Sequence, residues 1–427
     1  MERFIIEGGR SLHGSITPAG NKNAALPLLA AALLTDQPIT LHNMPMITDV
    51  ATKLAMMQRL GVSVERKGDH SWELRADHIN GNHPDQALAR KIRTSILLAG
   101  PLLARRGHVI LPRPGGDQIG RRRLDTHFQA LRELGASIEI TPTTYEMRAD
   151  RLRGADIFLD EMSVTGTEQA ILGAVLAEGT TTIANAASEP HIQELCRCLN
   201  AMGARIEGIG TNLLTIEGVT SLGGVEHTIG PDYMEVVSFI GLAAVTGSEL
   251  RIVGARPREH RMSRIAFQKL GVTWRDEGED IVVPAQQELT VQSDAHGAIP
   301  KIDSAPWPGF NTDLLITALV VATQARGTVL IHEKMFENRL VFVDRLIAMG
   351  ARIILCDPHR AVVVGPSRLY GEHLSSPDIR AGMALLIAAL CAEGRSVIDN
   401  IGQIDRGYER IDERLRALGA HIERVRE

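Results

Sequence analysis

Residues 412–425, DERLRALGAHIERV, contain the pattern that decides the fold. Leu415 and Leu418 lie on one helical face ahead of Gly419, and the residues after the glycine alternate between polar and apolar. This pattern predicts an amphipathic helix that ends near the glycine and is followed by a short strand. The same Leu/Met-Gly-Ala/Val step, with a strand-like segment after it, occurs six times in the 427-residue chain.

The six steps divide the chain into units of similar length. Neighbouring glycines are separated by 74, 68, 68, 79 and 69 residues, and they are Gly61, Gly135, Gly203, Gly271, Gly350 and Gly419. Each unit also contains a run rich in Ala and Leu that is apolar nearly all round, such as AALPLLAAALL at 24–34. A helix of that kind must be buried.

The sequence therefore predicts an α/β protein of six repeats, each with a buried helix, strands and an outer helix. Solenoid repeats are typically about 20–50 residues long, so these longer units favour compact domains of three repeats, divided near residue 230. The alternative is an ordinary α/β protein in which the step recurs by chance.

Composition excludes several classes of function. The net charge of −5 argues against general nucleic-acid binding, which needs a cationic face. The four cysteines lack the paired spacings of a zinc site, so we expect no metal. The N-terminus does not resemble a signal peptide and no run is long enough to span a membrane, so we expect a cytoplasmic protein that does not bind membranes.

Polar residues recur at equivalent places in the repeats. Short polar segments precede the buried helices, and Arg122 and Arg406 each lie thirteen residues before a repeat glycine. Helix N-termini attract anions, and basic side chains would add full charge. The candidates are Lys22, Arg93, Arg122, Arg339, Arg380 and Arg406. Taken singly, each could be a solvated residue at a helix end, but the matched positions favour an anion site.

Two other features have competing interpretations. Three arginines at 121–123 are usually just solvated, yet one or two could grip a phosphate. Asp313 follows PWPGFNT, and its spacing favours a helix N-cap. Asp117, between two glycines and the arginines, is poorly explained as a cap.

The whole chain resembles the enolpyruvyl transferases. The resemblance is carried by GNKNAALPLLAAALL (20–34), RTSILLAGPLLARRG (93–107), RPGGDQIGRRRLDTH (113–127), SAPWPGFNTD (304–313), MFENR (335–339) and IDRGYERIDERLRALGAHIERV (404–425). It implies two inside-out α/β barrels of three repeats each, with the active site in the cleft between them. The expected domains are residues 22–230, with a catalytic loop at 113–127, and residues 1–21 with 231–427.

The resemblance also implies the reaction. Phosphoenolpyruvate would transfer its enolpyruvyl group to the 3-hydroxyl of UDP-N-acetylglucosamine with release of phosphate, the first committed step of peptidoglycan synthesis, without any cofactor. Lys22, Arg122 and Arg406 match residues that hold phosphoenolpyruvate, and Asp313 matches the proposed base. Positions that match substrate contacts are Asn23, Arg93, Arg122, Arg123, Leu124, Asp125, Thr126, Ser163, Val164 and Met335, and Arg339 and Arg380 belong to the same charged surface.

Asp117 is the main departure from the family, most members of which have cysteine there. A carboxylic acid can also donate a proton, but neighbouring arginines favour its charged form. We therefore expect the proton to return to Asp117 only when phosphoenolpyruvate offsets the arginines and the loop closes, with Gly115 and Gly116 as the hinge. Fosfomycin alkylates the family's thiol, so the aspartate predicts resistance.

The chemistry agrees with the resemblance. Addition across an enol double bond needs an acid, a base and cations, and the chain supplies two carboxylates with an arginine-lysine cluster. No Ser-His-Asp order, phosphate-binding GxxxxGK[ST] loop or paired metal ligands support another mechanism. The alternatives are the sister enzyme that makes 5-enolpyruvylshikimate-3-phosphate, a paralogue with a different acceptor, and a non-catalytic UDP-sugar-binding protein.

Overall fold

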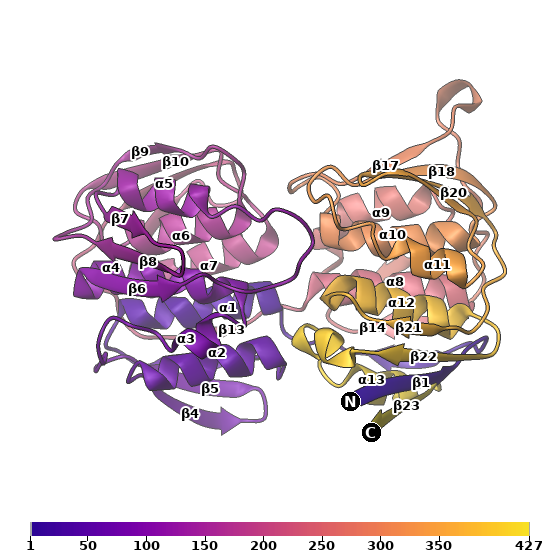
Figure 1. Cartoon of the computed structure of the whole chain (residues 1–427), viewed down its shortest axis with the longest axis horizontal. Helices are drawn as coiled ribbons and strands as arrows, with labels where there is room; N and C mark the ends of the chain where they lie inside the picture. The colour runs from indigo at the N-terminus through magenta and orange to yellow at the C-terminus, as the bar shows by residue number, and fades with distance from the viewer. Residues whose placement is uncertain (1, 427) are drawn as a thin grey trace. The chain divides into compact units, whose positions relative to one another are not determined.

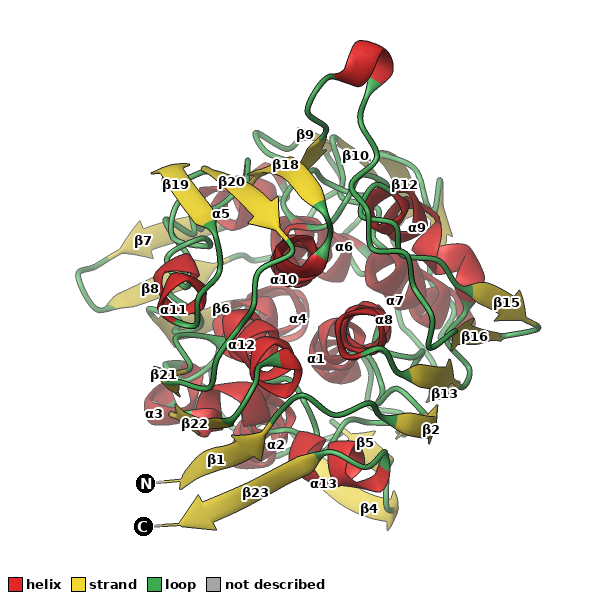
Figure 2. Cartoon of the chain, turned by 90° about the vertical axis from the view of Figure 1, so that its right-hand side faces the viewer, coloured by secondary structure: helices red, strands yellow, loops and turns green. Residues whose placement is uncertain are grey.

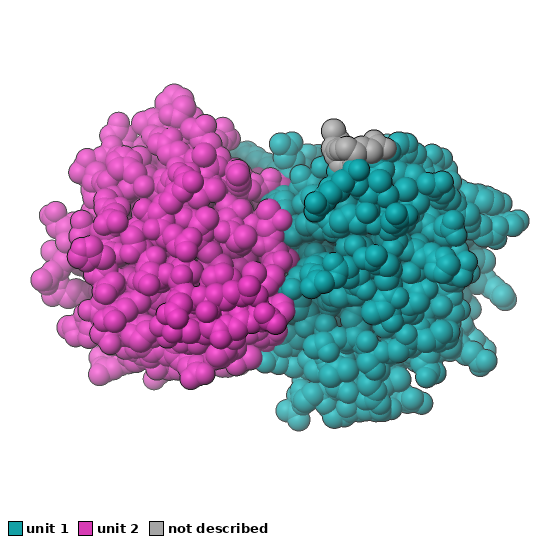
Figure 3. Space-filling view, turned by 90° about the horizontal axis from the view of Figure 1, so that it is seen from below, with its two compact units in different colours: residues 1–19, 118–121, 231–427 teal, residues 20–117, 122–230 magenta. Residues whose placement is uncertain are grey.

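The structure, a computed structural model, describes residues 2–426 and divides into two compact units. Unit 1 comprises Met1–Ala19, Gln118–Arg121 and Pro231–Glu427, and unit 2 comprises Gly20–Asp117 and Arg122–Gly230 (Figure 3). The chain enters unit 2 at residue 20, close to the expected residue 22, and there the Asn21 N–H donates to the Gly230 carbonyl at 2.8 Å. Residues 118–121 group with unit 1, whereas the sequence suggested a loop wholly in the other domain.

The predicted repeats are present, and each begins with a buried helix. In unit 2 these helices are α1 (Lys22–Ala31), continued by the 3-10 helix η1 (Ala32–Leu34); η2 (Arg93–Leu98) with α4 (Ala99–Arg106); and α6 (Val164–Ala174). In unit 1 they are α8 (Tyr233–Thr246), α10 (Thr312–Gln324) and α12 (Ile379–Cys391) (Figure 1). Within residues 2–426, no helix is long and apolar enough to cross a membrane.

The second helix of each repeat ends as the glycine step predicts. These helices are α2 (Thr48–Arg59), α5 (Asp125–Glu133), α7 (Pro190–Ala201), α9 (Arg261–Gln268), α11 (Val343–Ala348) and α13 (Ile411–Ala417), and shorter helices are α3 (Gln86–Ala89), η3 (Pro257–His260), η4 (Ala295–Gly297) and η5 (Ile401–Arg406). All six repeat glycines have positive φ, from 81° at Gly271 to 107° at Gly350. Glycine adopts this left-handed conformation without the steric cost of a Cβ, which is why it closes these helices.

Unit 2 has three sheets in its described residues. Their orders are β13-β3-β5-β4 (Val225–Thr228, Ile39–His42, Ser71–Arg75, Ser63–Gly68), β6-β8-β7 (His108–Pro112, Thr144–Arg148, Ser137–Ile140) and β11-β12-β10-β9 (Arg205–Glu207, Leu213–Glu217, Thr180–Ala184, Asp156–Phe158). Strand β13 pairs in parallel with β3, with Val225 opposite Ile39, so the last strand of the unit completes its first sheet.

Unit 1 also has three sheets in its described residues. Their orders are β15-β16-β14-β2 (Arg275–Glu277, Asp280–Val283, Glu249–Ile252, His13–Ile16), β17-β18-β20-β19 (Lys301–Asp303, Gly327–His332, Arg360–Gly365, Ile353–Asp357) and β21-β22-β1-β23 (His373–Ser375, Arg395–Asp399, Glu2–Glu7, His421–Arg426). Strand β2 pairs in parallel with β14, with Ile16 opposite Ile252. Unit 2 is therefore inserted into the crossover between β2 and α8.

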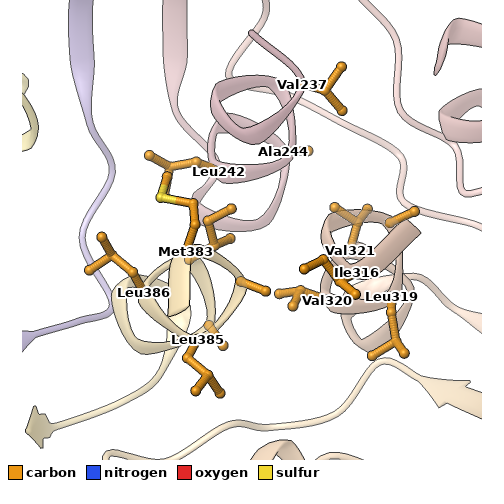
Figure 4. Packing of buried hydrophobic residues seen from close by; sticks show 14 of the residues in the cluster. Val237, Leu242, Ala244, Ile316, Leu319, Val320, Val321, Met383, Leu385 and Leu386 are labelled. Atoms are coloured by element: carbon orange, nitrogen blue, oxygen red, sulfur yellow. The ribbon is translucent and has the colours of Figure 1, made fainter. Parts of the chain in front are cut away.

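The three buried helices of unit 1 form the centre of its core. Figure 2 shows α8, α10 and α12 nearly end on, with the sheets outside them. Val237, Leu242, Val321 and Met383 come from these three helices and are essentially inaccessible to solvent (Figure 4). This arrangement of helices inside and sheets outside is the predicted inside-out α/β architecture.

Candidate active site

In unit 2, the N-terminus of α1 presents a lysine that is paired with a buried acid. Lys22 is the first residue of α1, and its Nζ lies 2.8 Å from Asp49 Oδ2 of α2. The Asn21 side chain caps the helix by accepting from the Asn23 N–H at 2.8 Å. The positive end of the α1 dipole and the Lys22 ammonium group are therefore close together, and Asp49 holds the ammonium group in position.

Arg93 connects the start of η2 to the arginine loop. Its Nη2 donates to the carbonyls of Arg122 at 3.0 Å and Arg123 at 2.6 Å. Burial and the nearby charge of Arg122 lower the pKa of Arg93 to about 10, so the guanidinium remains charged at neutral pH. Arg93 therefore fixes the backbone of the two arginines that follow Asp117.

The glycines before Asp117 allow the loop to pack against η2. A Cβ on Gly115 would lie 2.0 Å from the Arg90 carbonyl oxygen, and one on Gly116 would lie 2.9 Å from Arg93 Cβ. Gly116 also has φ +112°, a left-handed conformation. Close approach and backbone conformation thus account for both glycines, whereas the sequence suggested only a hinge.

Beyond Asp117 the loop is anchored in unit 1. Ile119 is buried, and its carbonyl accepts from the Asn338 N–H at 3.0 Å. A Cβ on Gly120 would lie 2.2 Å from Glu337 Oε2. Asp117 itself is half-buried.

Arg123 and Thr126 share one carboxylate in unit 2. Arg123 Nη2 lies 2.7 Å from Asp160 Oδ2, and the Thr126 hydroxyl donates to Asp160 Oδ1 at 2.8 Å. Arg123 Nε also lies 3.2 Å from Asp125 Oδ2. Arg123 therefore shows the ion-paired, exposed arrangement that is common for loop arginines.

The N-termini of α5 and α6 lie against each other. A Cβ on Gly166 would come within 2.9 Å of Thr126 Cγ2. The Ser163 hydroxyl caps α6 by accepting from the Gly166 N–H at 3.1 Å, and Val164 is the first residue of that helix. Leu124, which precedes α5, is buried.

In unit 1, Asp313 lies between two buried arginines. Arg339 Nη2 forms a hydrogen bond with Asp313 Oδ1, and Arg380 Nε lies 3.2 Å from Asp313 Oδ2. The expectation that Asp313 is an N-cap is wrong: Asn311 is the N-cap, and its side chain accepts from the Asp313 N–H at 2.8 Å. The carboxylate of Asp313 is consequently available for the arginines.

Arg380 is held by further groups of unit 1. Its guanidinium lies 5.4 Å from the centre of the Tyr408 ring. Burial opposes its charge, but Tyr408, Asp313 and Asp232 outweigh burial and hold the pKa of Arg380 well above its usual range. Burial in turn raises the pKa of Asp232 to about 6 despite the nearby Arg380.

The remaining candidates of unit 1 are more open. Arg406 ends η5 and is half-buried, and its Nη1 donates to Gln403 Oε1 at 2.8 Å. Met335 is 38% exposed, and its N–H donates to Glu333 Oε1 at 2.7 Å.

Sequence reasoning missed the acids that organise these cations. Asp49 lies twelve residues before Gly61, close to the position that Arg122 and Arg406 occupy in their repeats. A comparison of the residues at the start of the second helix in all six repeats would have found Asp49. Asp232 belongs to a short polar segment before a buried helix, but nothing in the sequence indicated that it lies near Arg380, and Asp160 had no such signal. Within residues 2–426, no group of three His, Cys, Asp or Glu side chains could hold a metal ion.

Comparisons with known proteins agree over the full length. The chain matches the family model of EPSP synthase (3-phosphoshikimate 1-carboxyvinyltransferase) over residues 6–415. It is 58% identical over 423 residues to a UDP-N-acetylglucosamine 1-carboxyvinyltransferase of Treponema denticola, covering 99% of each chain. It is 56% identical over 425 residues to the protein of that name in Bradyrhizobium diazoefficiens, covering 100% of this chain and 98% of the relative.

Solved structures share the architecture. The enolpyruvyl transferase NikO from Streptomyces tendae has a TM-score of 0.89 at 24% identity, with 99% of both chains covered. EPSP synthase from Acinetobacter baumannii has a TM-score of 0.76 at 19% identity, with 100% of both chains covered. At these identities the solved structures establish the fold alone.

Proposed function

Because the chain belongs to the EPSP synthase family of enolpyruvyl transferases, we propose that it transfers the enolpyruvyl group of phosphoenolpyruvate to the 3-hydroxyl of UDP-N-acetylglucosamine. The observation that carries this proposal is the high identity, over the whole chain, to relatives named for that reaction. The reaction begins peptidoglycan precursor synthesis, and the proposed location is the cytoplasm, where both substrates are made.

The cations are proposed to hold the donor. Lys22, Arg122 and Arg406 bind the phosphate and carboxylate of phosphoenolpyruvate. Two features support this role for Lys22: it begins α1, where helix N–H groups also attract anions, and Asp49 restrains its ammonium group. Restraint matters because a cation that is already in place loses less conformational entropy when the substrate binds.

The acceptor is proposed to contact Asn23, Arg93, the segment Arg122–Thr126, Ser163, Val164 and Met335. The described contacts support one part of this set. Arg93 fixes the Arg122 and Arg123 carbonyls, and the α5 and α6 N-termini that carry Thr126 and Val164 are adjacent. These groups give hydrogen-bond partners and a positive helix end suited to a nucleotide sugar.

The reaction proceeds by addition and elimination. The oxygen of the sugar 3-hydroxyl adds to C2 of phosphoenolpyruvate while Asp117 delivers a proton to C3. Asp313 accepts the hydroxyl proton. The ionised Asp117 then takes a proton back from C3 as phosphate leaves C2, which restores the double bond. The proton held by Asp313 leaves with the phosphate, so both carboxyl groups return to their starting states.

Asp313 can act as a base only if its ion pairs weaken. A carboxylate gripped by Arg339 and Arg380 is stabilised in its charged form and is a weak proton acceptor. The two anionic substrates supply competing negative charge for these arginines. Substrate binding therefore releases Asp313 for proton transfer at the stage when it is needed.

Phosphate release tests the proposal. Purified protein receives phosphoenolpyruvate with UDP-N-acetylglucosamine, each substrate alone, or phosphoenolpyruvate with shikimate 3-phosphate. We expect release only with the UDP-sugar. Release with shikimate 3-phosphate instead would identify the sister reaction, and UDP-sugar binding without release would identify a binding protein or a changed donor or acceptor.

A further inference from the structure

A lysine in the core of unit 2 has no part in the proposed chemistry. Lys53 of α2 is fully buried, and its Nζ donates to the Thr94 carbonyl of η2 at 2.7 Å. Glu168 of α6, also buried, attracts it electrostatically. Lysine is rarely buried completely because its charge loses hydration there, so three helices meeting at one lysine need an explanation.

On each of these helices, Lys53 or the residue that it contacts lies close in sequence to the candidate substrate-binding residues or to the acid that holds one of them. On α2 it is four residues after Asp49, the partner of Lys22. On η2 its hydrogen-bond partner follows Arg93 directly. On α6 its acidic neighbour is four residues after Val164, which is one helical turn.

The contact with η2 continues towards the arginine loop. Lys53 fixes the backbone at Thr94, and the adjacent Arg93 donates to the Arg122 and Arg123 carbonyls. No side chain caps the N-terminus of η2, because its N-cap residue is Ile92. The position of the Arg93 side chain therefore depends on backbone anchors such as Lys53.

We propose that Lys53 is a positioning residue for the nucleotide-sugar acceptor, acting through the Thr94 carbonyl to place Arg93 and the Arg122–Arg123 backbone. The proposal rests on the proposed function for the identity of the acceptor. Lys53 itself does not touch substrate.

Its surroundings make this contact sensitive to pH. Burial lowers the pKa of Lys53 to about 7, and Glu168 opposes that shift. Glu189 repels the charged form of Glu168. His191 Nε2 lies 3.8 Å from Glu168 Oε1. Burial raises the pKa of Glu168 well above its usual range.

The acid one turn before Lys53 on α2, Asp49, pairs with Lys22 of α1. With a pKa of about 7, Lys53 loses its proton near neutral pH. The ammonium form donates a stronger hydrogen bond to Thr94 than the neutral amine does.

The test uses Lys53→Met, which removes the donor and keeps an unbranched side chain. Met57→Leu, at a buried position one turn further along α2, is the matched control for a change in the core. We expect Lys53→Met to raise KM for UDP-N-acetylglucosamine about tenfold and KM for phosphoenolpyruvate by a clearly smaller factor, because only Arg122 of the displaced backbone also serves the donor, with kcat within about twofold of wild type. Met57→Leu should leave all three constants near wild type.

The pH profile separates positioning from packing. In the wild type, KM for the UDP-sugar should rise between pH 6 and pH 8 as Lys53 loses its proton, and in Lys53→Met this rise should be absent. If KM of the wild type for the UDP-sugar does not change between pH 6 and pH 8, the proposal is overturned. This measurement uses only the wild-type protein, so it does not depend on whether Lys53→Met folds. Equal changes in both KM values, or a lower kcat alone, would also overturn it.

Hydrogen exchange tests the same contact without turnover. Amides of residues 93–98 should exchange about tenfold faster in Lys53→Met than in Met57→Leu, whether or not substrate is present. Equal exchange in the two variants would overturn the positioning role. Absence of phosphate release by the wild type would refute the proposed function. The hydrogen-exchange comparison would still test whether Lys53 fixes the backbone of η2.

Discussion

Asp313→Asn should destabilise unit 1 because it removes one charge from a buried cluster of three. The asparagine keeps the shape of the side chain, but Arg339 and Arg380 lose their common counter-ion. Their side chains are only 2% and 6% exposed, so water cannot replace the lost interaction fully.

The expected loss follows from this burial. Removing one partner of a buried ion pair costs roughly 3–5 kcal/mol of unfolding free energy. The lower end applies here because Asp313 is itself 21% exposed and Arg339 retains Asp378 at 3.8 Å. A loss of about 3 kcal/mol corresponds to a decrease in Tm of roughly 6–12 °C for a unit of this size.

The assay is urea unfolding at neutral pH, followed by circular dichroism, with Asp357→Asn as the matched control. Asp357 also pairs with an arginine, Arg360, but their side chains are 30% and 54% exposed. Such exposed pairs contribute little to stability because water screens them. If the two variants lose the same stability, or if Asp313→Asn matches wild type, the argument from burial is wrong.

Three other changes have defined outcomes. Asp117→Asn should abolish phosphate release because an amide cannot deliver the proton, and retained activity in this variant would contradict the proposed role. Asp117→Cys should retain activity and, unlike wild type, should be inactivated by fosfomycin in a time-dependent assay. Gly116→Ala should lower kcat/KM for the UDP-sugar at least tenfold because its Cβ would clash with Arg93. The control Gly81→Ala, at φ +73° with nothing within 4 Å of the new Cβ, should cost only about 1–2 kcal/mol of stability. Equal activity in the two variants would refute the packing argument. Burial raises the pKa of Asp232 to about 6, so the folded protein binds more protons than the unfolded chain between about pH 4 and 6 and loses stability as pH rises through that range. Asp232→Asn should remove roughly 2 kcal/mol of the difference in unfolding free energy between pH 4.5 and pH 7, and an unchanged pH dependence would show that Asp232 is not its source.

Several elements could be predicted because their cause is local. A repeat glycine such as Gly350 follows a short amphipathic helix, and its positive φ is the ordinary way to end one. The apolar character of α10 and α12 required burial wherever they packed. Lys22 and Arg93 were found because they stand at the starts of such helices.

The partners of these residues could not be predicted in the same way. Asp313 was expected to cap its own helix, but it pairs with Arg380, which is 67 residues away. Asp49 restrains Lys22 across two helices, and Lys53 reaches Thr94 across 41 residues. A local pattern contains no information about which distant side chain a carboxylate or an ammonium group meets.

The sequence by itself determined the six repeats, the buried helices, the glycine turns and the family, because each depends on residues close together in the chain or on motifs kept in order. The tertiary structure alone decided which strands complete each sheet, where the chain enters unit 2, and which charges neutralise one another. Those choices depend on distance and burial in three dimensions. A charge is stabilised by whatever lies within a few ångströms of it, and folding brings residues from distant parts of the chain into that range.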